Sequence, residues 1–355
     1  MSQSKFFELK EKIIETGKCT SCGTCVAVCP AHCLELHDLK PNMIDSKESS
    51  EVNECLECNL CLNFCPRSSY NMEFTEKYDP KISLGNTFSA RTNDKEIKAR
   101  CQDGGIVTTI IKFLFDEKLI DGALVSKFNK DWKPEPIIIQ NKEELKSSSG
   151  TRYNISPNVS ILTLKHLIED LDLPYGDVNK LRIAFVGTPC QILAIKKLQS
   201  YKTNSQIFPS NVIKYTIGLF CMENFQYDKI MEEFVSKKLK ISIDSLKRMN
   251  ISKGKLLIQI DGNDEPISVA VKELDPYTNS ACHYCVDFSN LYADISVGSI
   301  GSKSGYSTII VRNKKGREIF ERALKKDYFK TIQLTQKDLD SIRVLENIKK
   351  NKIKN

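Results

Sequence analysis

The chain has 355 residues, enough for about two domains, and 41% of them are hydrophobic, which is ordinary for a globular protein. No apolar run approaches the roughly 20 residues that cross a bilayer, so no transmembrane segment is expected, although a peripheral place in a membrane complex stays open. The net charge of +7, mostly from lysine, favours acidic partners or substrates, or else reflects a solvated lysine-rich surface. No nucleic-acid partner is expected.

The N-terminal residues 1–18 have the pattern of a polar-flanked amphipathic helix and lack the apolar core and cleavage site of a secretory signal. The expected location is therefore the cytoplasm. Fourteen cysteines are many for such a chain, and a reducing cytosol disfavours disulfides. Scattered core cysteines would explain a few of them but not clusters with regular spacing, so metal binding is the leading interpretation.

Eight cysteines form two matched runs with the spacing C-x2-C-x2-C-x3-C, each followed by a proline. These are Cys19, Cys22, Cys25 and Cys29, and then Cys55, Cys58, Cys61 and Cys65. The spacing is that of bacterial-type ferredoxins, in which the fourth cysteine of each run binds the other of two [4Fe–4S] clusters. We predict one cluster at Cys19, Cys22, Cys25 and Cys65, and a second at Cys55, Cys58, Cys61 and Cys29. A zinc site, commonly two separated C-x2-C pairs, fits this pattern poorly.

The internal repeat predicts a bacterial-type two-cluster ferredoxin domain over residues 10–75. Cys33, four residues after the first run, is either a spare ligand or a small apolar filler. Residues 76–94 have turn residues and weak periodicity, which is typical of a connecting stretch.

Beyond this stretch, strand patterns and helix patterns alternate. The expected helices are 104–119, with an apolar stripe at Ile106, Ile110, Phe113 and Leu114, and 156–171, 190–199, 227–239 and 315–326. The expected strands are 120–128, 136–140, 180–187, 212–221, 293–299 and 307–313. The alternation predicts an α/β domain over residues 82–355, built on a mixed sheet with helices on both faces.

Four more cysteines lie far from the first eight. Cys190 follows a predicted strand at the start of a helix, Cys221 ends the next long strand, and Cys282 and Cys285 form a C-x2-C pair. Open α/β sheets bind ligands at the carboxyl ends of their strands, so these thiols could meet there as a set of four ligands. Structural cysteines and a redox-active C-x2-C pair are the alternatives.

Two segments have features suited to anionic groups. Gly104 and Gly105 stand at a predicted helix start, where glycine permits close approach and free N–H groups favour phosphate, although Gly-Gly is also ordinary turn chemistry. Residues 147–154 offer hydroxyl groups, N–H groups and Arg152 to an anion, or form a plain flexible loop.

Five stretches in this part carry a family resemblance. They are QDGGIVTTIIKFL, RYNISPN, AFVGTPCQI, GLFCMENF and CVDFSNLYADISVGSIG. In this order they resemble the family of beta subunits of coenzyme F420 hydrogenases and dehydrogenases, over most of residues 82–325. The fused double-cluster domain is similar to that of relatives resembling the electron-input subunit of F420H2 dehydrogenase. The match is weaker after residue 316, and Cys101 stands where relatives often have a small residue.

The resemblance implies a flavin-binding domain with one FAD, a site for the deazaflavin coenzyme F420 as substrate, and a third [4Fe–4S] cluster. The implied ligands of this cluster are Cys190, Cys221, Cys282 and Cys285. The candidates for flavin contact are Gly104, Gly105, Thr108, Ser148, Thr151 and Asn154. Arg152 and Lys127 are the candidates for the entrance of the anionic coenzyme. The flavin would carry the chemistry, so no catalytic side chain is expected, and the four histidines look incidental.

These parts predict an F420-dependent oxidoreductase in which a flavin exchanges a hydride with the coenzyme and single electrons with three clusters. Electrons would pass in either direction to a redox partner protein, either a ferredoxin or the subunits of a larger oxidoreductase complex. One alternative is a flavin reductase of the same fold that acts on another organic substrate. The other is an electron-relay subunit without a hydride site.

Overall fold

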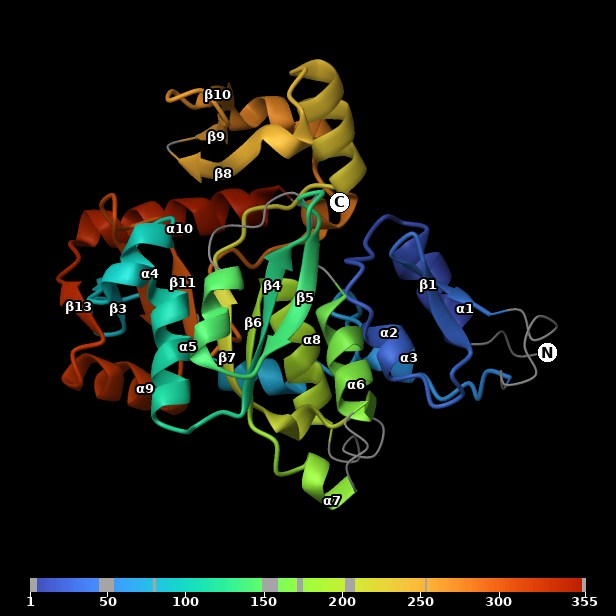
Figure 1. The fold of residues 1–355 in the computed structure, drawn as a ribbon. Helices are drawn as coiled ribbons and strands as arrows, with labels where there is room; N and C mark the ends of the chain where they lie inside the picture. Colours follow the sequence, from blue (N-terminus) through green and yellow to red (C-terminus); the bar gives the residue numbers. More distant parts are fainter. Residues whose placement is uncertain are drawn as a thin grey trace.

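The computed structural model describes residues 5–44, 54–78, 81–148, 159–170, 175–201, 208–252 and 254–352. Within them, an eight-stranded mixed sheet has the order β13-β3-β12-β11-β7-β6-β4-β5 (Figure 1). Its strands are β3 (Thr87–Thr92), β4 (Gly122–Phe128), β5 (Pro134–Ile139), β6 (Ile183–Gly187), β7 (Ile213–Leu219), β11 (Ile295–Gly298), β12 (Ser307–Val311) and β13 (Phe329–Ile332). The four central strands β11, β7, β6 and β4 are parallel, and the outer pairings are antiparallel.

Helices cover both faces of this sheet, as the sequence predicts. On one face lie α5 (Ile106–Asp116) and α9 (Lys314–Lys325), which share a core with Ala123 and Val125 of β4. On the other face lie α6 (Ser160–Asp170) and α8 (Pro189–Ser200), which pack against Leu124 of the same strand. Neighbouring residues of a strand point to opposite faces, so one apolar run supplies both cores.

The N-terminal segment packs beside α6 and α8 (Figure 1). It contains α1 (Lys5–Leu9), the π-helical turn η1 (Lys10–Ile14), α2 (Thr24–Ala27), the hairpin of β1 (Leu34–His37) and β2 (Lys40–Met43), α3 (Leu60–Asn63) and η2 (Glu73–Lys77). Ala27, Val28, Leu60 and Phe64 belong to the same hydrophobic core as α6 and α8. A shared hydrophobic core therefore holds the N-terminal segment against the helices that cover the sheet. The domain boundary at residues 10–75 stays a prediction.

A three-stranded antiparallel sheet, absent from the sequence predictions, is inserted after β7. Its strands are β8 (Leu246–Ser252), β9 (Lys255–Ile260) and β10 (Ile267–Ala270), and its helices are η6 (Asp228–Lys238), η7 (Ile243–Ser245) and η8 (Val271–Tyr277). They share a core of their own, which includes Phe234 and Leu256. This insertion stands beyond one end of the large sheet in Figure 1.

The expectation that residues 76–94 only connect two parts is wrong, because Thr87–Thr92 form β3 inside the large sheet. Small polar side chains alternate with Phe88 and Ala90 there, so hydrophobicity alone does not reveal the strand.

The C-terminal helix α10 (Gln336–Asn351), whose Leu339 and Ile342 pack on the sheet, was also not predicted from the sequence. The remaining elements are α4 (Lys95–Arg100), η3 (Lys142–Ser148), α7 (Tyr175–Val178), η5 (Ser210–Val212) and η9 (Ser280–Tyr284). Over the described ranges, no helix combines the length and hydrophobicity that crossing a membrane requires.

Candidate functional site

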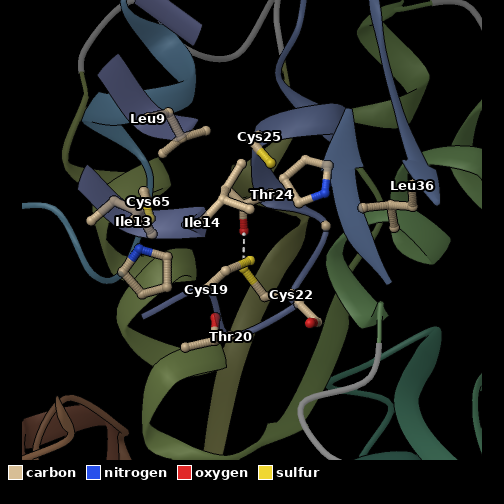
Figure 2. A pocket seen from close by; sticks show the side chains of 14 residues that line it. Leu9, Ile13, Ile14, Cys19, Thr20, Cys22, Thr24, Cys25, Leu36 and Cys65 are labelled. Carbon is tan, nitrogen blue, oxygen red and sulfur yellow. Dashed lines mark hydrogen bonds between the residues drawn. The ribbon is translucent and has the colours of Figure 1, made fainter. Parts of the chain in front are cut away.

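Four cysteines of the N-terminal segment line one pocket (Figure 2). They are Cys19, Cys22, Cys25 and Cys65. The last cysteine of the second run has thus joined the first three of the first run, and Leu9 and Ile13 contribute apolar walls. Burial raises the pKa of Cys65 to about 12 and the pKa of Cys25 well above its usual value, and neighbouring thiolates add to both increases. We name these four residues the inner group.

The other four cysteines of the two runs line a second pocket. They are Cys29, Cys55, Cys58 and Cys61, named here the outer group. Cys33 lies in the same wall, with its Sγ 3.5 Å from the Sγ of Cys29. Burial, with the Cys29 hydrogen bond, raises the pKa of Cys33 to about 12. The exchange of the fourth cysteines is the arrangement that the ferredoxin spacing predicts, and the binding of iron by these thiols stays a prediction.

The two cysteine runs have matching backbone conformations. Gly23 before α2 and Asn59 before α3 both have left-handed φ values, of +75° and +62°. Ser21 and Glu57, at equivalent positions of the two runs, are left-handed too, with φ of +57° and +52°. Glycine and asparagine tolerate this region better than most residues do. The sequence repeat is therefore also a repeat of two tight loops, each followed by a short helix.

The four distal cysteines meet at the carboxyl edge of the large sheet, and we name them the distal group. Cys190 is the second residue of α8, directly beyond β6, and Cys221 follows β7, the neighbour of β6. Cys282 lies in η9, and Cys285 comes directly after it. Burial raises the pKa of Cys221, and negative charge on the other three thiols adds to this increase. The four thiols therefore lie close enough to influence one another.

Asn224 ties two members of the distal group together. Its backbone N–H donates to the Sγ of Cys282 at 3.3 Å, and its side-chain Nδ2 donates to the Sγ of Cys221 at 3.5 Å. Hydrogen bonds to sulfur stabilise a thiolate and tune a bound cluster. Thr188 Oγ1 lies 3.3 Å from the Sγ of Cys190 in the same way.

Two cations flank the distal group. Arg67 of the N-terminal segment donates to the backbone oxygens of Ala281 and Tyr284, at 3.0 and 3.2 Å. Lys349 of α10 is buried and donates through Nζ to the backbone oxygen of Cys221. Burial acts to raise the pKa of Cys285, but Arg67, Lys349 and a hydrogen bond with the backbone of Asp287 together outweigh it, and the pKa of this thiol is lowered.

The three groups of thiols fit iron–sulfur clusters chemically. Burial raises the pKa of Cys190 to about 12, so an ionised thiolate there needs a compensating cation, which bound iron supplies. No three thiol, imidazole or carboxylate groups in the part of the chain that the structure describes are placed to hold one metal ion. A cubane cluster separates its ligands more widely than a single zinc ion does. All fourteen cysteines are free of disulfides.

The inner and distal groups are neighbours. Negative charge on Cys22 of the inner group contributes to the raised pKa of Cys190, after burial and Cys285. The buried side chain of Lys197, in the same helix as Cys190, donates to the backbone oxygens of Cys65 and Ser68, at 2.7 and 2.8 Å. Ser280 Oγ also donates to the backbone oxygen of Gly17 at 2.9 Å. Direct hydrogen bonds therefore hold the N-terminal segment against the elements that carry the distal group.

The residues predicted to contact the flavin or to line the entrance of the coenzyme fall into three sets. Gly104 and Gly105 lie at the start of α5, but a Cβ on Gly104 would meet the backbone of Ala90 and Ser307, so packing within the chain already requires glycine there. Thr108 in α5, Ser148 at the end of η3 and Lys127 near the end of β4 are half-buried. Thr151, Arg152 and Asn154 lie outside the described residues. Among the described candidates, none lines either of the two thiol pockets.

A cationic cluster near Gly104 and Gly105 was missed in the sequence. Arg91 ends β3 and lies over the ring of Tyr306, which Lys303 also approaches. The guanidinium of Arg248 reaches the backbone oxygen of Gln102 at 3.5 Å. The end of β3 and the start of β12 lie at the carboxyl edge of the large sheet, as do Cys190 and Cys221. No local motif marks these cations, because distant segments supply them.

Family models match most of the chain. Residues 87–163 match the N-terminal part, and residues 180–337 the C-terminal part, of "Coenzyme F420 hydrogenase/dehydrogenase, beta subunit". Residues 18–70 match the "4Fe-4S dicluster domain".

Two relatives and one solved structure extend this match. The coenzyme F420 hydrogenase subunit beta of Methanosarcina barkeri is 37% identical over 74% of this chain and 88% of its own length. A subunit of the F(420)H(2) dehydrogenase of Methanosarcina mazei is 29% identical over 87% of this chain and 83% of its own length. A chain of the F420-reducing [NiFe] hydrogenase complex from Methanosarcina barkeri superposes with a TM-score of 0.67 at 35% identity, covering 75% of this chain and 89% of that one. The protein therefore belongs to the family of coenzyme F420 hydrogenase/dehydrogenase beta subunits and carries a 4Fe-4S dicluster domain at its N-terminal side.

Proposed function

We propose that this protein is an F420-dependent flavin and iron–sulfur oxidoreductase. In this role it passes electrons between reduced coenzyme F420 and a protein partner, through one bound FAD and three [4Fe–4S] clusters. A bound flavin would supply the exchange between two-electron hydride chemistry and one-electron transfer. The names of the relatives support the coenzyme, and the two matched family parts support the class of reaction.

The observation that carries the proposal is the position of the distal group. Cys190 and Cys221 lie at the ends of neighbouring parallel strands, where open sheets of this kind bind ligands. The inner group lies next to them and the outer group shares its loops, so the three groups form a connected series. Electron transfer to a protein partner requires a series of one-electron centres that leads away from the edge of the sheet where the ligand binds.

The cationic cluster of Arg91, Arg248 and Lys303 supports an anionic ligand at the same edge. Coenzyme F420 and FAD both carry phosphate, and arginine binds phosphate through paired N–H donors. Burial raises the pKa of Asp103, while Arg248 partly opposes this effect, so the two residues lie close together in this region. Arg152 lies outside the described residues and stays a candidate for coenzyme contact. Lys127, near the end of β4, lies along the same edge as the cluster.

The test uses the full chain, reconstituted with iron, sulfide and FAD under anoxic conditions. We expect about twelve iron atoms and one FAD per chain, and rapid bleaching of F420H2 when a viologen dye is the acceptor. Flavin without F420 turnover would favour a flavin reductase for another organic substrate. Clusters without flavin would favour an electron relay.

Two matched variants locate the third cluster. Cys190→Ser removes a distal ligand and should reduce the iron content to about eight atoms per chain. Cys101→Ser removes a thiol that lies outside all three groups and should leave the content unchanged. Equal iron in both variants and in the wild type would contradict a cluster at the distal group.

A further inference from the structure

The two cations beside the distal group come from opposite ends of the chain. Arg67 follows the second cysteine run, and its two hydrogen bonds span the loop from Ala281 to Tyr284, which contains Cys282. The Nε of Arg67 is buried and has no hydrogen-bond partner among the described residues. The two hydrogen bonds go to neutral carbonyl oxygens, so they orient the guanidinium and leave its positive charge uncancelled.

Lys349 is the second cation of the group. It lies in the last turn of α10, is 2% exposed, and donates to the backbone oxygen of Cys221. Leu339 and Ile342 of the same helix pack into the core against Ile310 and Phe288, which fixes the approach of the helix. A lysine at this depth needs a negative partner, and negative charge on Cys221, Cys285 and Cys282 of the distal group favours its charged form.

Neither cation is neutralised by a salt bridge. In the ranges that the structure describes, no carboxylate lies within salt-bridge distance of Arg67 or Lys349. The half-buried carboxylate of Asp287 acts electrostatically on Lys349 after three thiols of the distal group, and it accepts from the backbone N–H of Leu291 at 3.0 Å. The positive charge is therefore available to the thiolates.

We propose that Arg67 and Lys349 are positioning residues that act as fixed counter-charges for a cluster at the distal group and raise its reduction potential. The proposal rests on the proposed function, which places a cluster there. One-electron reduction adds one negative charge to a thiolate-bound cluster without requiring a proton. Nearby fixed positive charge stabilises the reduced form more than the oxidised form, most strongly where water is excluded.

Arg67 gives this arrangement a second property. Since it belongs to the N-terminal segment, the same residue that sets the charge at the distal group follows Cys65 of the inner group by two positions. Docking of the N-terminal segment and the potential of the distal cluster are thereby coupled. A displaced segment would leave the distal group with Lys349 alone.

The experiment is an anoxic redox titration of the reconstituted full chain, followed by electron paramagnetic resonance. The signal that is absent in Cys190→Ser belongs to the distal group. We expect Arg67→Gln and Lys349→Gln each to shift the one-electron reduction equilibrium of this signal at least tenfold toward the oxidised form, which is about 59 mV. The charge-conserving variants Arg67→Lys and Lys349→Arg should shift it by less than threefold.

Lys352→Gln is the matched control. It removes a charge from the same helix end, but Lys352 is exposed and paired with Glu223 at 3.2 Å. It should leave the distal signal in place. A Lys352→Gln shift as large as that of Lys349→Gln would overturn the proposal, as would equal shifts in Arg67→Gln and Arg67→Lys.

Iron content separates the possible failures. A wild-type chain without distal iron overturns the proposed function and the counter-charge role together. A loaded distal cluster with an unshifted potential in both glutamine variants overturns the counter-charge role alone. Loss of distal iron from both glutamine variants, with retention in Arg67→Lys and Lys349→Arg, overturns the potential-setting role and assigns the two cations to cluster assembly.

Discussion

The N-terminal groups and the distal group each bring four thiols together, but they do so in different ways. The eight N-terminal cysteines lie within two short loops, and the local spacing decides which thiols meet. The distal thiols come from three separate places, and they meet only because β6 and β7 are neighbours in the sheet. The first arrangement is encoded locally and the second by topology. This difference determines how each group should respond to substitution.

The largest expected effect is loss of a whole cluster. Cys22→Ser and Cys221→Ser should each lower the iron content of the reconstituted chain by about four atoms, because a cubane needs its ligand at each corner. Iron and sulfide analysis measures this loss. If the distal thiols were structural, only Cys22→Ser would lose iron, and the comparison between the two regions would fail.

The next largest effect concerns the core shared by the two regions. Phe64 is fully buried between the N-terminal segment and the layer of α6 and α8. Phe64→Ala should lower the free energy of unfolding by about 3–5 kcal/mol, through lost burial and a new cavity. Urea unfolding followed by circular dichroism measures it, with Phe7→Ala, at an exposed phenylalanine of the same segment, as the control. Separate unfolding of the N-terminal segment, with an unchanged second transition, would contradict a shared core.

A smaller difference is expected in the lability of the clusters. Cys58 of the outer group is exposed, whereas Cys285 of the distal group is buried. A chelator with a mild oxidant should therefore remove iron from the outer group several-fold faster than from the distal group. Spectra recorded during iron release would show which signal is lost first. Simultaneous loss from all groups would indicate global unfolding instead of local access.

The smallest effect is expected at Cys33. Its thiol lies beside Cys29, but the outer group already has four cysteines without it. Cys33→Ser should keep about twelve iron atoms per chain and lower stability only slightly, by about 1 kcal/mol, through burial of a hydroxyl group. A loss of four iron atoms would make Cys33 a ligand and would weaken the predicted exchange of the fourth cysteines.

The sequence was most informative where structure is local. The repeated spacing predicts which thiols share a cavity, and apolar runs such as 183–187 predict the central strands. It was least informative where burial depends on distant partners. Thr87–Thr92 carries little hydrophobic signal, and its place in the sheet follows from pairing with the distant strands β12 and β13.

The cations of the site show the same limit. Arg67 and Lys349 lie in ordinary lysine- and arginine-containing stretches, and only the folded chain brings them to the distal group. The same applies to Arg91 and Arg248, which come from the large sheet and from the inserted sheet. A rule based on sequence spacing cannot find such residues. A search of the folded structure for basic side chains without a salt bridge beside buried thiols would find them.

The packing of Phe64 and its neighbours has a kinetic consequence. A carrier that swings between donor and acceptor has a rate that depends on the friction of the solvent. Here the inner cysteines are attached to a loop whose apolar side chains are embedded in the body of the protein. The rate of electron transfer within the protein should therefore not change when glycerol raises the solvent viscosity. Only the rates of binding to the coenzyme and to the partner protein should fall.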